Sequence, residues 1–385
     1  MNQLQQPTLN QDMVQAYQQA FQMAGLSGSK SADLLLAHNM DPACLRPYQL
    51  NDGRICVDRW DMQQNKYVVQ QVGYNADPVN NATTFRKDAW LQFDQAVIAA
   101  ARPRMKAWAD IRAAGLTYTI PNGIGKTSLE YEEQSDIRRA TISMDGLRRG
   151  DTDRAVYNPK TMPLPIIHKD FDFSIRQIQG SRNTASPLDT TNAALAGEKV
   201  AEEVERLTIG NALPIQYAAQ QIPGMINFPG RLTKVMTPPV LASGAPNPAW
   251  SPELHIQELL EMRQQSKNAF HYGPWSVYHS PNWDVAYDQD YSANKGTNTL
   301  RSRIGEVEGF NTPMSLDYLD GWQVIMLQMS INVVRGVIGM EIVTVQWDSE
   351  GGFLRNYKVM CILLPQFRTD FYNRTGIVHG VATPA

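Results

Sequence analysis

The residues of this chain that come closest to a chemical motif are Gly123-Ile124-Gly125-Lys126-Thr127. A phosphate-binding loop ends in such a Gly-Lys-Thr run and holds phosphate oxygens with its backbone N–H groups. That loop needs a first glycine five positions before Gly125, where this chain has Ile120, and Pro121 removes one N–H donor. We interpret the segment as the turn at the base of a loop. A nucleotide-dependent enzyme or soluble hydrolase using this segment is the alternative.

Metal binding is not indicated by the spacing of the possible ligands. The histidines show no HExxH or other ligand spacing. They are His38, His168, His255, His271, His279 and His379. Asp284, Asp288 and Asp290 lie close together in the sequence and could offer oxygen ligands to a metal ion. The glycine and the final glutamate of an EF-hand loop are missing, however. We interpret these aspartates as a solvated acidic loop.

Nucleophilic catalysis has no motif in the sequence either. The chain lacks the Gly-x-Ser-x-Gly turn of serine hydrolases. Its three cysteines, Cys44, Cys56 and Cys361, are too few and too scattered for a disulfide framework or a zinc site. We therefore predict that the protein is not an enzyme and has no catalytic, cofactor-binding or metal-binding residues.

Charge and hydropathy argue against two further classes of protein. The 385 residues carry a formal net charge of −3, whereas a protein held to nucleic acid by phosphate contacts shows a basic excess. The first residues do not have the pattern of a signal peptide, and no apolar run reaches the roughly 18 residues that span a bilayer. We expect an intracellular protein that does not bind nucleic acid tightly and does not contact a membrane.

The clearest structural pattern is a strand followed by a long helix. In residues 164–175, Phe171 and Phe173 alternate with charged side chains, which predicts a half-buried strand. Residues 189–210 predict a helix roughly 30 Å long that ends at Gly210. Its buried stripe consists of Ala193, Ala196, Val200, Val204 and Leu207.

Shorter patterns predict the other elements. Helices are predicted near Asn10 or Asp12, over residues 87–101, and from Ser251, with Pro252 at the first helical position. Hairpins are predicted from residues 54–60 with 66–72 and from 343–347 with 353–364, and strands over 275–279 and 322–329. Residues 120–162 predict a charged, extended two-stranded segment. It has too few apolar residues to be stable as an isolated ribbon.

Six motifs occur in the order found in one family of proteins. They are Trp90-Leu91-Gln92-Phe93-Asp94, Ile120-Pro121-Asn122-Gly123-Ile124-Gly125, Ile222-Pro223-Gly224-Met225-Ile226-Asn227, Ser251-Pro252-Glu253-Leu254, Tyr272-Gly273-Pro274-Trp275 and Asn311-Thr312-Pro313. Together with the strand and the long helix, this order resembles the encapsulin branch of the major capsid proteins of tailed bacteriophages, which have the Hong Kong 97 fold. The resemblance covers roughly residues 84–364.

The resemblance implies an α+β fold of the Hong Kong 97 type with named parts. Residues 1–85 would be an N-terminal arm, 86–119 an amphipathic helix leading into the P-domain, 120–163 the E-loop, 164–232 the P-domain with the spine helix 189–210, 233–335 the A-domain, and 336–385 the returning P-domain strands and C-terminal tail. The arm is expected to dock on a neighbouring subunit, and packing on its own subunit is the alternative.

In capsid proteins of this fold, the E-loop lies across the adjacent subunit. The residues that would make these intersubunit contacts are Glu130, Glu132, Glu133, Arg138, Arg139, Arg148, Arg149, Asp151, Asp153 and Arg154. The alternative is a solvated hairpin whose surface ion pairs contribute little. Some relatives form a Lys–Asn crosslink from this loop. Lys126 and Lys160 lie at its two ends rather than at its tip, so we predict no crosslink.

The function implied by the resemblance is that of a major capsid protein. Copies would assemble as pentamers and hexamers into an icosahedral shell around the double-stranded DNA of a tailed phage, in the cytoplasm of a bacterial host. Expected partners are the chain itself, a portal, and scaffolding or decoration proteins, with DNA contacted only non-specifically. The alternative is an encapsulin-type nanocompartment shell that encloses a cargo enzyme.

Overall fold

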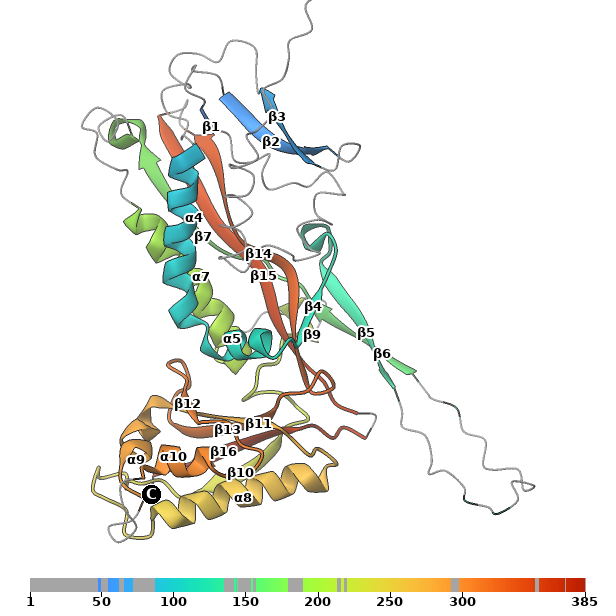
Figure 1. The fold of residues 1–385 in the computed structure, drawn as a ribbon, viewed down its shortest axis with the longest axis vertical. Helices are drawn as coiled ribbons and strands as arrows, with labels where there is room; N and C mark the ends of the chain where they lie inside the picture. The colour runs from blue at the N-terminus through green and yellow to red at the C-terminus, as the bar shows by residue number, and fades with distance from the viewer. Residues whose placement is uncertain are drawn as a thin grey trace, which may run out of the picture.

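The computed structural model describes residues 48–49, 55–61, 66–71, 87–134, 142, 144, 154, 157–178, 190–212, 216–217, 220–291, 298–349, 353–370 and 372–384. Figure 1 shows two lobes, each built on a β-sheet, and a hairpin that projects away from both. The helix expected near Asn10 or Asp12 lies outside the described residues.

The first lobe is built on a four-stranded sheet with the order β4-β14-β15-β7. Its strands are β4 (Thr117–Thr119), β14 (Val334–Ser349), β15 (Leu354–Phe367) and β7 (Ile167–Ser174). The long strands β14 and β15 form an antiparallel hairpin, and β7 pairs antiparallel with β15 while β4 runs parallel to β14. Near the hairpin's tip, β15 alternates buried with half-buried residues, as a sheet with one covered face requires.

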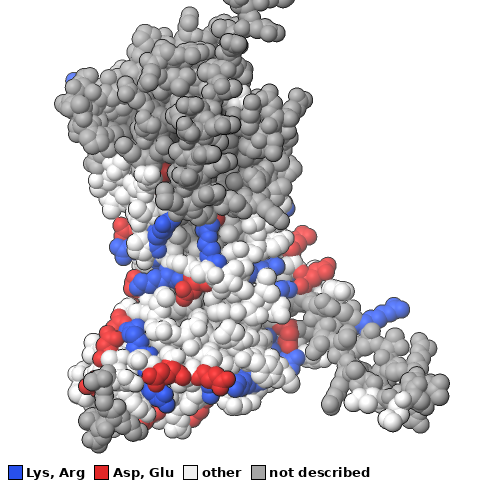
Figure 2. All heavy atoms as spheres, viewed as in Figure 1, with Lys and Arg blue, Asp and Glu red and all other residues white. Residues whose placement is uncertain are grey.

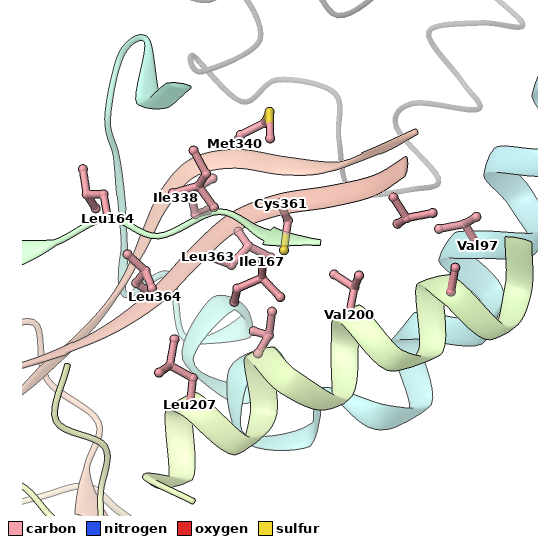
Figure 3. Packing of buried hydrophobic residues seen from close by; sticks show 14 of the residues in the cluster. Val97, Leu164, Ile167, Val200, Leu207, Ile338, Met340, Cys361, Leu363 and Leu364 are labelled. Carbon is pink, nitrogen blue, oxygen red and sulfur yellow. The ribbon is translucent and has the colours of Figure 1, made fainter. Parts of the chain in front are cut away.

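Two helices lie against this sheet, α4 (Lys87–Ala101) and α7 (Thr191–Ile209). Helix α7 ends where Gly210 adopts a φ of 105° and donates its N–H to the Arg206 carbonyl oxygen. Figure 3 shows Val200 and Leu207 of α7 pointing toward Ile167, Cys361 and neighbouring residues of the sheet. A Cβ on Gly197 would lie 2.8 Å from the Val97 carbonyl oxygen, so α4 and α7 can approach this closely only because residue 197 is glycine.

The second lobe contains a five-stranded sheet with the order β10-β16-β13-β11-β12. The strands are β10 (Leu232–Met236), β16 (Ile377–Ala382), β13 (Trp322–Gln328), β11 (Trp275–His279) and β12 (Met314–Ser315). Helix α8 (Pro252–Asn268) covers one face, and the Ser251 side chain caps it by accepting the Leu254 N–H. Three short helices complete the lobe: η4 (Pro281–Trp283), α9 (Asp284–Asp288) and α10 (Leu300–Gly305).

Helix α5 (Lys106–Ala113), which follows η2 (Arg102–Arg104), joins the two lobes. Its Trp108 belongs to the core of the first lobe, whereas Ala107 and Ile111 belong to a cluster with Ile325 and Leu327 of β13. Because α5 fills both cores, the lobes share a continuous apolar contact.

One chain segment lies in a different place from the one we expected. Residues 336–385 were expected to be the returning P-domain strands and a C-terminal tail, but β16 in this tail pairs with β10 and β13 in the middle of the second sheet. Ile377 and Val378 are fully buried, one in the cluster with α5 and the other in the cluster with α8. One face of β16 therefore packs against α8, and the other packs against the cluster that includes α5.

The projecting hairpin consists of β5 (Ser128–Gln134) and β6 (Tyr157–Pro163), which pair antiparallel. Next to its base lies the turn η3 (Gly123–Gly125). A separate antiparallel sheet is formed by β1 (Tyr48–Gln49), β2 (Ile55–Asp61) and β3 (Lys66–Gln71), and a small ladder by β8 (Gln216–Tyr217) and β9 (Gln220–Gln221). None of the helices in the described ranges is long and apolar enough to cross a membrane.

Candidate functional site

The projecting hairpin is anchored at its base and exposed beyond it. Leu129 and Met162 are buried in the core of the first lobe. Farther out, Glu130, Glu132 and Tyr157 are exposed. A two-stranded ribbon of this kind has no second layer of its own, so the exposed residues that the structure describes on it contribute little to the core of the subunit.

The structure describes only some of the charged residues assigned to the hairpin. Glu130 and Glu132 lie on β5, and Arg154 is exposed near β6. Glu133 also lies on β5, but its side chain is outside the description. The others, Arg138, Arg139, Arg148, Arg149, Asp151 and Asp153, lie outside the described residues.

Two apolar side chains between β5 and β6 were not among the predicted contact residues. Ile142 and Met144 are exposed by 93% and 106% of their reference area. Single exposed apolar residues are common, but here they accompany a charged ribbon that leaves the body of the subunit. Their signal in the sequence was their position between charged runs, which we attributed to ionic contacts alone.

The glycine-rich segment forms a turn that packs against the sheet. The Asn122 side chain accepts the Gly125 N–H, and Asn122 itself has a φ of 54°. A Cβ on Gly123 would collide with the backbone of Gly339 in β14. Gly123 is buried, so this backbone faces a strand and not an open cradle, as the interpretation of a loop-base turn requires.

The long helix α7 supplies the rigid body from which the hairpin projects. Its residues Ala193, Ala196, Val200, Val204 and Leu207 are all buried in the core of the first lobe. These small and branched side chains let the helix lie close to the sheet, and buried apolar area of this kind is the main stabilising contribution to a fold.

A second face of α7 is also buried. It carries the carboxylate of Glu205, for which the sequence pattern gave no predicted position. Glu205 is 1% exposed and accepts hydrogen bonds from the Ala107 N–H at 2.7 Å and the Trp108 N–H at 3.2 Å. Burial raises the pKa of Glu205 to about 7 despite these two donors. The signal was available as the spacing of Ala201, Glu205 and Thr208 along a second helical stripe.

Polar contacts also connect the lobes through α5. The Tyr278 hydroxyl of β11 donates to Asp110 at 3.0 Å, and Arg112 forms an ion pair with Glu341 of β14 at 2.7 Å. Burial raises the pKa of the Glu341 carboxyl, which is only 8% exposed. One short helix therefore links both sheets to the spine, and this arrangement restrains the angle between the lobes.

Asp284 and Asp288 belong to helix α9 and not to a loop, whereas Asp288 and Asp290 are exposed to solvent as we expected. Asp284 and Asp288 both form ion pairs with Arg301 of α10, at 3.4 and 3.0 Å. Nearby, His255 donates to or accepts from the Tyr287 hydroxyl at 3.0 Å, and burial lowers the pKa of His255 to about 3. Within the described part of the chain, no three metal-ligating side chains converge.

The charged side chains of the surface are mixed in sign. On the face shown in Figure 2, Lys and Arg lie among Asp and Glu over the described part of both lobes. A surface of this kind favours contacts with a complementary protein surface over a continuous anionic partner.

Comparison with known proteins shows which protein family this chain belongs to. A family model described as "Family of unknown function (DUF6260)" matches residues 80–380. The chain belongs to this family. The match includes the spine helix, the projecting hairpin and nearly all of both sheets.

A curated relative extends the comparison. The type 1 encapsulin shell protein EncA of Myxococcus xanthus is 26% identical over 200 residues, which are 51% of this chain and 61% of EncA. The aligned part of this DUF6260 chain thus spans less than two thirds of the length of EncA.

Solved structures show the fold. The virus-like particle from Pyrococcus furiosus matches with a TM-score of 0.53 and 17% identity, over 75% of this chain and 97% of that chain. The capsid of Myoviridae phage XM1 matches with a TM-score of 0.49 and 10% identity, over 70% of this chain and 91% of that chain. The expected α+β fold of the Hong Kong 97 type is confirmed.

Proposed function

We propose that this member of the DUF6260 family is the subunit of a closed protein shell, and that the shell is the head of a tailed bacteriophage. The observation that carries the proposal is the hairpin β5–β6, which is anchored by Leu129 and Met162 but exposed beyond them. The similarity to an encapsulin shell protein supports a shell as the product of assembly.

The mechanism of such a protein is mechanical. The spine helix α7, buried on two faces and bonded to α5 through Glu205, makes each subunit a rigid unit. The projecting hairpin would gain a second layer by lying across a neighbouring copy. Each contact is modest, but a closed symmetric lattice repeats every contact in every subunit, so the sum is large.

The shell would enclose double-stranded DNA and assemble as pentamers and hexamers in the bacterial host, together with a portal and with scaffolding or decoration proteins. The formal net charge of −3 suits an inner wall that does not bind DNA tightly. The second candidate is an encapsulin-type compartment that holds a cargo enzyme, and the similarity to EncA favours it.

Electron microscopy of the expressed chain tests the proposal. Closed shells should form, and particles isolated from the native source should contain DNA and carry a portal. Shells of smaller diameter that contain a protein cargo would favour the compartment instead. A chain that stays monomeric at high concentration would contradict both candidates.

A double variant tests the role of the hairpin. Arg148→Glu with Arg149→Glu should leave the subunit folded but reduce the yield of shells, because ionic contacts with a neighbour would become repulsive. Shell yields equal to those of the wild type would contradict the proposed role. A denaturing gel of mature particles should show single chains, since no crosslink is predicted.

A further inference from the structure

The first sheet carries a group of hydrogen-bond donors without acceptors at the end that approaches the second lobe. Arg335 of β14 pairs across the hairpin with Gln366 of β15. Arg368 directly follows β15, and its N–H continues the pairing by binding the Val333 carbonyl oxygen. Residues two positions apart on a strand point to the same face of the sheet, so these three side chains are neighbours. We call Arg335, Gln366 and Arg368 the donor cluster.

The Arg335 guanidinium of the donor cluster is held in one orientation. Its Nε donates to Gln366 Oε1, and its central carbon lies 4.5 Å from the centre of the Tyr118 ring of β4. A Cβ on Gly336 would lie 3.0 Å from the Trp108 ring, so Arg335, one residue earlier, points to the sheet face away from α5. Figure 1 shows β4 and β14 close to the base of the projecting hairpin at this point.

Two donors of the cluster are buried and have no partner. Gln366 is 1% exposed, and its Nε2 makes no hydrogen bond. Arg368 Nε is also buried without a partner. Turning the Gln366 amide over would not help, because its N–H groups would then face the Arg335 Nε–H. A buried donor without an acceptor costs free energy, so both groups require an acceptor that the subunit does not supply.

The cluster also carries uncompensated positive charge. Within the residues that the structure describes, neither Arg335 nor Arg368 forms an ion pair. The titratable neighbours that act on Arg335 are Arg368, Tyr118 and Tyr131, and none of these is a carboxylate. Burial and then the charge of Arg368 lower the pKa of Arg335. A water molecule could accept from the donors, but it would leave two half-buried cations unbalanced.

We propose that the donor cluster binds a small, doubly charged oxyanion of which inorganic phosphate is the representative. The oxygens of the ion would accept from Gln366 Nε2, Arg368 Nε and the remaining N–H groups of Arg335, and its charge would balance the two cations. Guanidinium groups suit such ions because they offer several donors in a rigid plane. The bound ion would tie the start of β14 to the end of β15. This inference goes beyond the shell function and does not rest on it.

Thermal melts of the isolated full-length subunit test the site. They are recorded in sodium phosphate and in sodium chloride of equal ionic strength at about pH 8, where phosphate is doubly charged. With a Kd on the order of 1 mM, about 50 mM phosphate should raise the melting temperature by about 3–5 °C. Phosphate also stabilises proteins in general because it is excluded from their surfaces, so the decision comes from variants.

Arg368→Met removes one cation of the cluster and keeps a side chain of similar length. It should lose most of the response to phosphate, and in chloride it should melt at or above the wild type, because an unbalanced half-buried charge is gone. Arg303→Gln is the matched control. Arg303 is an exposed arginine of α10 that pairs with Glu306, and its replacement should leave the phosphate response unchanged.

Gln366→Glu is the sharper variant, because it places a carboxylate inside the donor cluster. The chain would then supply its own anion between Arg335 and Arg368. This variant should melt above the wild type in chloride and respond little to phosphate. It also decides the matter if Arg368→Met does not fold.

The source of the oxyanion is identified by comparing isolated subunits with assembled shells. A phosphate response in both would identify a free ion. A response in subunits that disappears in shells would show that a carboxylate of a neighbouring copy occupies the site there. Both results support an oxyanion site and differ only in its occupant.

Three results would overturn the inference. An equal rise for the wild type, Arg368→Met and Gln366→Glu would show a general salt effect. A wild type that does not respond to phosphate would show that the donors hold no such ion. A Gln366→Glu subunit that melts below the wild type would show that the cluster does not attract negative charge. The melts of isolated subunits do not depend on assembly, so failure here leaves the proposed shell function standing.

Discussion

The Glu205 carboxylate of α7 accepts the Ala107 N–H at the start of α5, at 2.7 Å, and the Trp108 N–H behind it. The first N–H groups of a helix have no partner within the helix, so a buried α5 needs an acceptor from elsewhere. Glu205 provides it from the spine helix. The same α5 contacts both sheets, and this contact therefore lies at the centre of the subunit's rigidity.

The stability of the subunit should depend on pH through Glu205. Its pKa is raised by burial from 4.5 to about 7, so the folded state binds a proton that the unfolded state has released between these values. The stabilising contribution is complete below pH 4.5 and is lost as the pH rises through 7. Relative to Glu205→Gln, the wild type should lose up to about 3 kcal/mol of unfolding free energy across this window.

Urea unfolding at several pH values measures this difference. Glu203→Gln, which removes a carboxylate from the outer face of the same helix, is the control and should follow the wild-type profile. Parallel profiles for the wild type and Glu205→Gln would show that Glu205 does not titrate in this range.

Gly197→Ala should destabilise the subunit by about 1–3 kcal/mol, because overpacking outweighs the gain in helix propensity. The new methyl group would lie 2.8 Å from the Val97 carbonyl oxygen, which is backbone and cannot rotate away. Gly305→Ala is the control, since its nearest atom is Thr312 Oγ1 at 3.4 Å. Thermal melts should show a lower midpoint for Gly197→Ala only.

Val200→Asp should prevent folding. Val200 is 1% exposed in the core of the first lobe, and the described core offers this position only apolar neighbours. An unpaired buried charge costs several kcal/mol, which is comparable to the whole stability of a domain. Leu195→Asp on the same helix, where the side chain is 50% exposed, should remain soluble and helical by circular dichroism.

Arg112→Met should cost about 3 kcal/mol of unfolding free energy, because it leaves the buried Glu341 carboxylate without its cation. The two side chains are 2.7 Å apart, and Glu341 is 8% exposed. Adding Glu341→Met should recover most of the loss, since an apolar pair of similar size often replaces a buried ion pair well. A double variant less stable than Arg112→Met would contradict this account.

Local patterns were sufficient for many elements. Helix α4 has the predicted bounds, and α8 begins after Ser251 with Pro252 at its first position. Strand β11 also has its predicted bounds, Trp275–His279. In these cases the capping residues and the hydrophobic period act over a few neighbouring positions and need no distant partner.

Other elements were not predicted, because their sequence pattern can be interpreted only once their neighbours in the fold are known. Strand β14 begins at Val334, nine residues before the predicted start, and its first part is buried on both faces. A strand covered on both faces does not alternate, so its sequence lacks the period that identifies a half-buried strand. For the same reason, nothing local assigned β16 to the second sheet.

The sequence by itself determined the family resemblance, the amphipathic stripe of α7 and the existence of a charged excursion after Gly125. Only the tertiary structure decided that Glu205 caps α5, that β16 joins the second sheet, and that Phe270 and Tyr372 come together around Arg374. The physical reason is distance along the chain. Capping and periodicity depend on neighbours a few residues apart, whereas these contacts join segments roughly fifty to a hundred positions apart, which only packing brings together.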